Sequence, residues 1–228
     1  EGALECFLTN EEVSAAAANT DQAYAGVMHR RLLVLRQEYL VVADILADEG
    51  GREHTFDWMY HNLGESISSD QAIESSGAGD GRGFEYLEDC FRGVTEGAIG
   101  ADIIQREHKV RIRVAAAEQS EILTATGPGE SVMHRVPVLF VTRRGTEARF
   151  AATIDPGDEK GDSVVRSVSS AESGSGLVIS VELTDGTREV FGYDPAGAAR
   201  HVEGIQTQAT LICLKQEGDG WAVLGESE

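Results

Sequence analysis

Apolar and polar residues alternate with a period of two along most of the chain, which is the pattern of β-strands that bury one face. The pattern predicts strands at residues 31–35, 38–45, 136–142, 148–154, 177–184, 188–193, 209–215 and 221–224. Turn-forming residues separate these strands into pairs. Residues 143–146, Asp185-Gly186 and residues 217–220 each predict a hairpin turn, with a type I′ turn at Asp185-Gly186.

Helical signal is scarce. Residues 11–19 carry an alanine run that fits either a short helix or a small-residue strand, and we favour the strand. Residues 66–83 crowd Ser, Gly and Asp together and predict a long polar loop, a kind of loop that is often functional. Residues 157–162 predict an acidic turn, which could bind calcium but lacks the spacing of an EF-hand loop. With no linker and no repeat, residues 1–228 are predicted to form a single all-β domain, an antiparallel β-sandwich of two packed sheets.

Composition narrows the class of protein. The chain has 228 residues, of which 41% are hydrophobic, so it can bury a full core. A formal net charge of −20 argues against nucleic acid or an anionic membrane surface as a partner. No apolar run approaches the roughly 18 residues that a membrane helix needs, so we expect a soluble protein without a membrane span. The sequence starts at Glu1 with no leader, so any export signal is expected to have been removed or not included.

The three cysteines, Cys6, Cys90 and Cys213, are too few and too far apart for a disulfide framework. None lies in a Cys-x-x-Cys pair that could hold zinc. One bridge at most is compatible with this spacing. We expect buried free thiols.

The most informative segment is His-Thr-Phe-Asp-Trp-Met-Tyr-His-Asn-Leu-Gly-Glu, at residues 54–65. An ordered series surrounds it: Tyr24-Ala25-Gly26-Val27, Arg30-Arg31, a Tyr-x-Val-x-x-Asp strand at residues 39–44, Gly83-Phe84-Glu85-Tyr86-Leu87, and Asp155-Pro156. The series resembles the C-terminal β-sandwich domain of heparinase II/III-like and oligoalginate polysaccharide lyases. The resemblance spans roughly Tyr24 to Pro156, and beyond it only the strand pattern agrees.

The resemblance implies a fold and a reaction. These lyases cleave uronic-acid-containing polysaccharides, of alginate or glycosaminoglycan type, by β-elimination. A base removes the C5 proton beside the carboxylate, and hydrogen-bond donors or a cation stabilise the resulting charge. In the family an N-terminal (α/α) toroid supplies an Asn, a His and a Tyr, and these 228 residues contain no such helical half. The implied partners are an acidic polysaccharide and a helical toroid of the same enzyme, and the implied location is periplasmic or secreted.

Strand geometry selects candidate site residues. Asp57 and His61 would point to one face of their strand, and His54 with the aromatic residues to the other. His61 is the leading catalytic candidate, either facing the sugar or binding a metal, against the alternative of a core histidine satisfied by a neighbouring strand. Arg30, Arg31 and Asn62 are substrate-binding candidates, because guanidinium groups pair well with carboxylates. Arginines at strand ends could equally solvate a sheet edge.

The resemblance also implies a divalent metal, with zinc expected, held by two His and one Asp from separated strands. His61, Asp80 and His108 lie in a compatible order, although Asp89 competes with Asp80, and His108 could be one exposed residue in a charged turn.

Three functions remain open at this point. The chain could be the sandwich part of a uronate-specific lyase, a non-catalytic carbohydrate-binding module, or a structural β module of a larger secreted protein. A binding module predicts an exposed aromatic platform, for which Trp58 and Trp221 are candidates if they do not belong to the core. A structural module predicts a buried His61.

Overall fold

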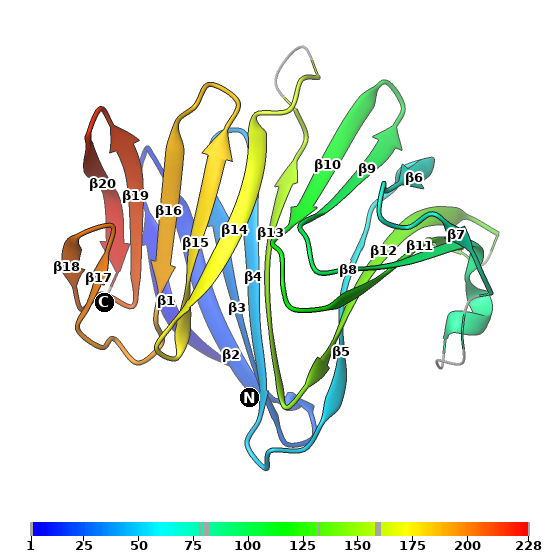
Figure 1. The fold of residues 1–228 in the computed structure, drawn as a ribbon, viewed down its shortest axis with the longest axis horizontal. Helices are drawn as coiled ribbons and strands as arrows, with labels where there is room; N and C mark the ends of the chain where they lie inside the picture. Colours follow the sequence, from blue (N-terminus) through cyan, green and yellow to red (C-terminus); the bar gives the residue numbers. More distant parts are fainter. Residues whose placement is uncertain (1, 78, 80–82, 132, 158–160, 228) are drawn as a thin grey trace.

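The computed structural model describes residues 2–77, 79, 83–131, 133–157 and 161–227. These residues form antiparallel β-sheets, and the helical content of the described chain is one short 3-10 helix, η1 (Phe84–Tyr86). The prediction of an all-β fold with little helix is confirmed (Figure 1).

Three large sheets make up most of the molecule. The central sheet has eight strands in the order β1 (Ala3–Thr9), β2 (Ser14–Tyr24), β3 (Val27–Leu35), β4 (Leu40–Asp48), β13 (Glu147–Asp155), β10 (His108–Val114), β9 (Ile99–Gln105) and β6 (Ser66–Ser68). The β12 sheet has five strands in the order β5 (His54–His61), β12 (Arg135–Gly145), β11 (Ser120–Pro128), β8 (Glu88–Thr95) and β7 (Glu74–Ser75). The β15 sheet has five strands in the order β14 (Val165–Ser173), β15 (Gly176–Leu183), β16 (Arg188–Tyr193), β19 (Leu211–Glu217) and β20 (Gly220–Ser227). A separate hairpin, β17 (Arg200–Val202) and β18 (Ile205–Thr207), covers part of the β15 sheet.

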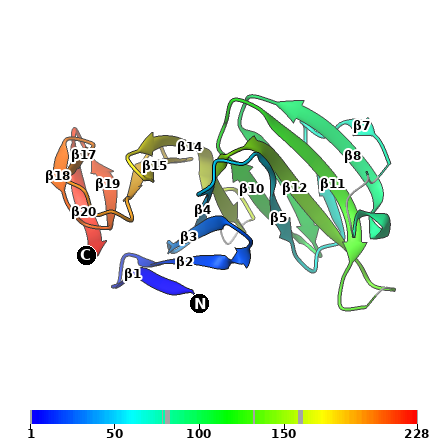
Figure 2. The same ribbon diagram turned by 90° about the horizontal axis from the view of Figure 1, so that it is seen from below.

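The central sheet carries a hydrophobic core on each face. Ala151 of β13 packs in the core shared with the β15 sheet, whereas its neighbours Phe150 and Ala152 pack in the core shared with the β12 sheet. Figure 2 shows the β15 and β12 sheets toward opposite ends of the molecule, with strands of the central sheet between them. The predicted two-sheet sandwich is therefore corrected to three sheets. The reason is that β4 and β13 are buried along most of both faces, and a strand of that kind belongs in the middle of three layers.

Several predicted strand pairs are present. Strand β3 pairs with β4, β15 with β16, and β19 with β20, in each case antiparallel and consecutive. The alanine run lies in β2, so the preference for a strand is confirmed. The predicted loop at residues 66–83 is interrupted by the short strands β6 and β7.

The hairpin predicted around residues 143–146 is not formed. Strand β12 pairs with β5 and β11, while β13 pairs with β4 and β10, so the chain crosses from one sheet to another at this turn. The chain does turn here, but residues 143–145 belong to β12 and only Thr146 lies between the two strands. A local turn signal does not specify whether the strands it joins pair edge to edge or pack face to face. The turn at Asp185-Gly186 is not type I′ either, because only Gly186 has a positive φ, at +90°.

A buried ion pair joins the central sheet to the β15 sheet. The guanidinium of Arg36 donates two hydrogen bonds to the Glu189 carboxylate, at 2.8 and 2.9 Å, and both residues are buried. The Tyr39 hydroxyl donates to the same carboxylate at 2.5 Å. Burial, followed by the charge of Glu189, holds the pKa of Tyr39 well above its usual range. The two layers are thus fixed by a bidentate contact inside their shared core.

We expect Glu189→Ala to lower the free energy of unfolding by about 3–5 kcal/mol, because it leaves the Arg36 charge buried without its partner. The control is Glu182→Ala, which removes the partner of Arg166 in an ion pair whose side chains are both about half exposed, and should cost less than about 1 kcal/mol. Urea unfolding of the three proteins measures both effects. Equal losses in the two variants would contradict a structural role for the buried pair.

The cysteines are free and buried, as expected. Burial raises the pKa of the Cys213 thiol to about 12 and raises that of Cys6 as well. The reactive form of a cysteine is the thiolate, so Cys213 should react very slowly in the native state at pH 8. A thiol-modifying dye should therefore label the folded protein slowly and label all three cysteines rapidly in urea. Rapid stoichiometric labelling of Cys213 without denaturant would show that its strand opens readily.

Candidate functional site

The strand that carries His61 alternates as predicted. Phe56 and Trp58 on β5 are 5% and 4% exposed and pack in the core, whereas Asp57 and His61 point outward and are exposed. The Asp57 carboxylate accepts a hydrogen bond from Thr142 Oγ1 at 2.5 Å. Within the described part of the chain, the side chain of His61 has no hydrogen bond or ion pair. His61 is therefore available to a ligand, and the alternatives of a core histidine and of a stacking Trp58 are wrong.

The three predicted substrate-binding residues do not form one group. Arg30 Nε donates to Glu5 at 3.0 Å, and Glu5 also accepts a hydrogen bond from Tyr193 of the β15 sheet. Arg31 belongs to the opposite face of β3, where its guanidinium donates to Asp44 at 2.7 and 3.1 Å. The central sheet thus separates the two arginines, and each already has a carboxylate partner. Asn62 caps its own turn by accepting a hydrogen bond from the Gly64 N–H at 2.8 Å.

The predicted metal ligands come from different sheets. His61 ends β5, and His108, which is exposed, begins β10. Asp80 lies outside the described residues. Among all the residues that the structure describes, no group of three His, Cys, Asp or Glu side chains is placed to hold a metal ion. The zinc site therefore stays a prediction.

Two buried carboxylates on β4 form clusters that the sequence pattern did not predict. Asp48 Oδ2 lies 2.6 Å from His54 Nε2 and accepts hydrogen bonds from the Arg52 side chain at 2.9 and 3.1 Å. The hydrogen bonds from Arg52, then that from His54, hold the pKa of Asp48 well below its usual range. Asp44 repeats this arrangement, with His29 Nε2 at 2.6 Å and the Arg31 guanidinium. The available signal was the position of both acids in an apolar strand, where each needs a cationic partner.

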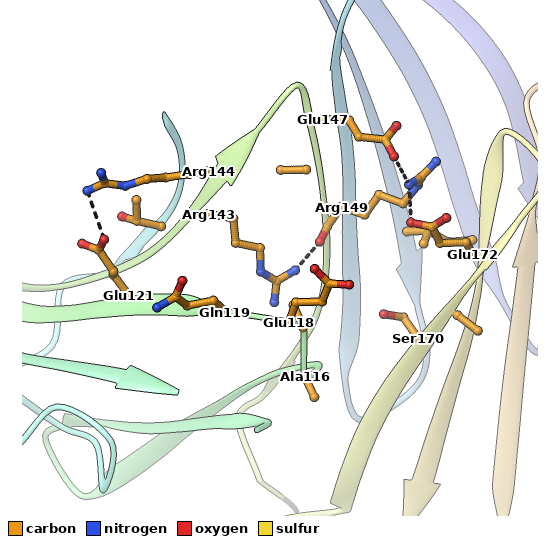
Figure 3. A pocket seen from close by; sticks show the side chains of 15 residues that line it. Ala116, Glu118, Gln119, Glu121, Arg143, Arg144, Glu147, Arg149, Ser170 and Glu172 are labelled. Carbon is orange, nitrogen blue, oxygen red and sulfur yellow. Dashed lines mark hydrogen bonds and ion pairs between the residues drawn. The ribbon is translucent and has the colours of Figure 1, made fainter. Parts of the chain in front are cut away.

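A cavity of about 450 Å3 opens where the β10–β11 connection, the β12–β13 turn and β14 meet. Figure 3 shows its charged lining. Arg144 pairs with Glu121 at 3.0 Å, and Arg149 pairs with Glu147 at 2.8 Å and with Glu172 at 2.5 Å. Most of the charge around the opening is thus compensated by ion pairs.

Arg143 is the exception in this lining. Its side chain is buried, with the residue 8% exposed, and lies over the Phe150 ring with the guanidinium carbon 4.6 Å from the ring centroid. Its guanidinium donates to Ser120 Oγ at 3.0 Å, to the Ala115 carbonyl at 2.9 Å and to the Arg149 carbonyl. Burial lowers the pKa of Arg143 to about 10. No carboxylate of the described chain forms an ion pair with it, so it is a buried cation without a counter-charge.

Known structures share this fold. Heparan sulfate lyase HepC from Pedobacter heparinus matches with a TM-score of 0.53 and 10% identity, and a mutant of the same enzyme matches with 0.52 and 10%. A protein described as heparinase III matches with a TM-score of 0.56 and 13% identity. Each match covers 83% of this chain but only 27% of the other, so the chain spans about a quarter of the length of these proteins. No family model matches the sequence, and no curated protein does.

These matches establish that the chain has the fold of a part of heparinase III-type lyases. In the described residues, no helix has the length and apolar character required to cross a membrane.

Acid should destabilise the protein partly through Asp48. Its pKa is lowered on folding, so its contribution to stability is present above the unfolded pKa of about 3.9 and is lost as pH falls toward the lower folded value. We expect Asp48→Asn to be less stable than the original at pH 6, and to lose less further stability between about pH 4 and 2. Urea unfolding across that range measures this, with exposed Asp21→Asn as control. Parallel pH profiles for all three proteins would exclude this linkage.

Proposed function

We propose that this chain is the β-sandwich portion of a polysaccharide lyase that cleaves uronic-acid-containing polysaccharide by β-elimination. The observation that carries the proposal is the structural match to heparinase III-type lyases over 83% of the chain. The exposed His61 side chain, which has no partner in the described chain, supports the proposal. A histidine can act as an acid or base only if its imidazole can reach the sugar.

In the proposed reaction a base removes the proton at C5 of the uronate, and the bond from C4 to the leaving sugar oxygen breaks. An acid protonates the departing oxygen, and the product keeps a double bond between C4 and C5. His61 is the proposed proton carrier from this chain. The remaining catalytic groups, and the facing wall of the cleft, are proposed to come from a helical toroid. The polymer, of alginate or glycosaminoglycan type, is the proposed partner.

Two further elements belong to the proposal. A divalent metal would be held by His61, His108 and Asp80, and two histidines with a carboxylate are a ligand set that suits zinc. No chemical step proposed above depends on this metal. Location in the periplasm or outside the cell would give the protein access to such polymers.

A second candidate function is polysaccharide binding without cleavage. The observation that favours it is the open, polar cavity beside buried Arg143, which does not depend on His61. A binding role also requires no contribution from a helical domain.

The purified chain should bind alginate or heparan sulfate in preference to dextran, a neutral polymer, and should release little or no unsaturated product, which is detected by its ultraviolet absorbance. In a longer polypeptide that includes a helical domain, His61→Ala should lower turnover by roughly 10²–10⁴ fold, the usual contribution of an acid or base. His201→Ala, which changes another exposed histidine, is the matched control.

Metal analysis of the same two variants tests the zinc proposal, since a bound ion should be lost with His61 and kept with His201. Absence of both polymer binding and elimination product would overturn the proposed function. Rapid turnover by the 228 residues alone would overturn the need for a helical domain.

A further inference from the structure

The cavity beside Arg143 contains unused hydrogen-bonding capacity. A guanidinium has five N–H donors, and Arg143 uses three of them, toward Ser120, Ala115 and Arg149. Two N–H groups remain on the side chain of Arg143, a residue that is only 8% exposed. A buried cation without a counter-charge is costly, so this position favours an anion.

Other lining groups support a ligand at the same place. Arg149 Nε is buried and has no hydrogen-bond acceptor in the described structure, although its outer nitrogen pairs with Glu147 and Glu172. Glu118 and Gln119 lie on the connection into β11 and are exposed at the cavity (Figure 3). Within the described chain, neither side chain forms a hydrogen bond or ion pair. The lining thus combines two arginine side chains, Arg143 and Arg149, with two polar side chains at the opening, Glu118 and Gln119.

We propose that this cavity binds the carboxylate of an acidic sugar through Arg143. A guanidinium is the side chain best suited to a carboxylate. The sugar hydroxyls would meet Glu118 and Gln119, and the apolar C–H face of the ring would meet Ala116. The volume of about 450 Å3 lies within the usual range for ligand sites. The choice of a uronate as the acid rests on the proposed function, whereas the cation and the cavity do not.

The negative residues around the opening set the selectivity. Glu121, Glu147 and Glu172 are engaged with arginines, so they repel an anion less than free carboxylates would. A single carboxylate on a small ring can reach Arg143, whereas the neutral ring of glucose gains nothing from the buried charge. We therefore expect the charge of the ligand, and not only its hydroxyls, to decide binding.

Nuclear magnetic resonance titration of the chain tests this with three probes: glucuronate, glucose and acetate. Glucuronate should bind at least about tenfold more tightly than glucose, which corresponds to one charge-assisted hydrogen bond. It should also bind more tightly than acetate, because acetate lacks the ring. Equal binding of glucuronate and glucose would overturn the proposal, and acetate binding as tightly as glucuronate would reduce the site to a simple anion site and overturn the sugar assignment.

The variants locate the site. Ala116→Trp fills the cavity from an exposed position without changing Arg143, and should weaken glucuronate binding at least about tenfold. Ala199→Trp, at an exposed loop position outside the cavity, should leave binding unchanged. Arg143→Lys should also weaken binding, and thermal unfolding checks that it folds. If it does not fold, Ala116→Trp decides the result, and unchanged binding in that variant would overturn the proposal.

Failure here is distinguishable from failure of the lyase proposal. Free glucuronate has no sugar linked at C4, so it cannot undergo the proposed elimination and reports binding alone. His61→Ala should leave glucuronate binding unchanged while it impairs the lyase reaction. Loss of glucuronate binding in His61→Ala would show that the sugar binds at β5 and not beside Arg143.

Discussion

Two adjacent strands, β4 and β13, are buried on both faces, and the arrangement of the other layers depends on this constraint. Ala43 of β4 lies opposite Ala151 of β13 in the register, and both residues face the core shared with the β15 sheet. Phe150 points the other way, into the core shared with the β12 sheet. Small residues on one side and a large aromatic ring on the other let two sheets pack against the same pair of strands.

Several buried charged groups join two layers of the molecule, or join a strand to the segment that leads into the next strand. Arg36 and Glu189 join the central sheet to the β15 sheet. Asp155, fully buried at the end of β13, accepts hydrogen bonds from the Val164 and Val165 N–H groups, both at 3.0 Å, at the entry to β14. Arg143, near the end of β12, donates a hydrogen bond to the Arg149 carbonyl of β13. Buried charges of this kind favour a single strand register, because a shifted strand would leave each charged group without its hydrogen-bond partners.

The structural matches and the two candidate sites are separate observations. The fold matches a part of enzymes that are described as acting on heparan sulfate, and that part is about a quarter of their length. His61 is exposed at the end of β5, whereas Arg143 is buried in the lining of the cavity. The proposed catalytic contact at His61 and the proposed binding contact at Arg143 lie on neighbouring strands of one sheet, β5 and β12, and a substitution can remove either one alone.

Period-two alternation by itself determined the all-β class, most of the strands, and the direction of the side chains on β5, because strand geometry fixes which residues share a face. It did not determine which strands pair: β12 and β13 read as a hairpin but lie in different sheets. The pairing of Arg36 with Glu189, 153 residues away, and the isolation of Arg143 from the carboxylates of the described chain were likewise decided only by the tertiary structure. The physical reason is that burial and charge compensation depend on neighbours far apart in the chain, and a local pattern carries no information about those neighbours.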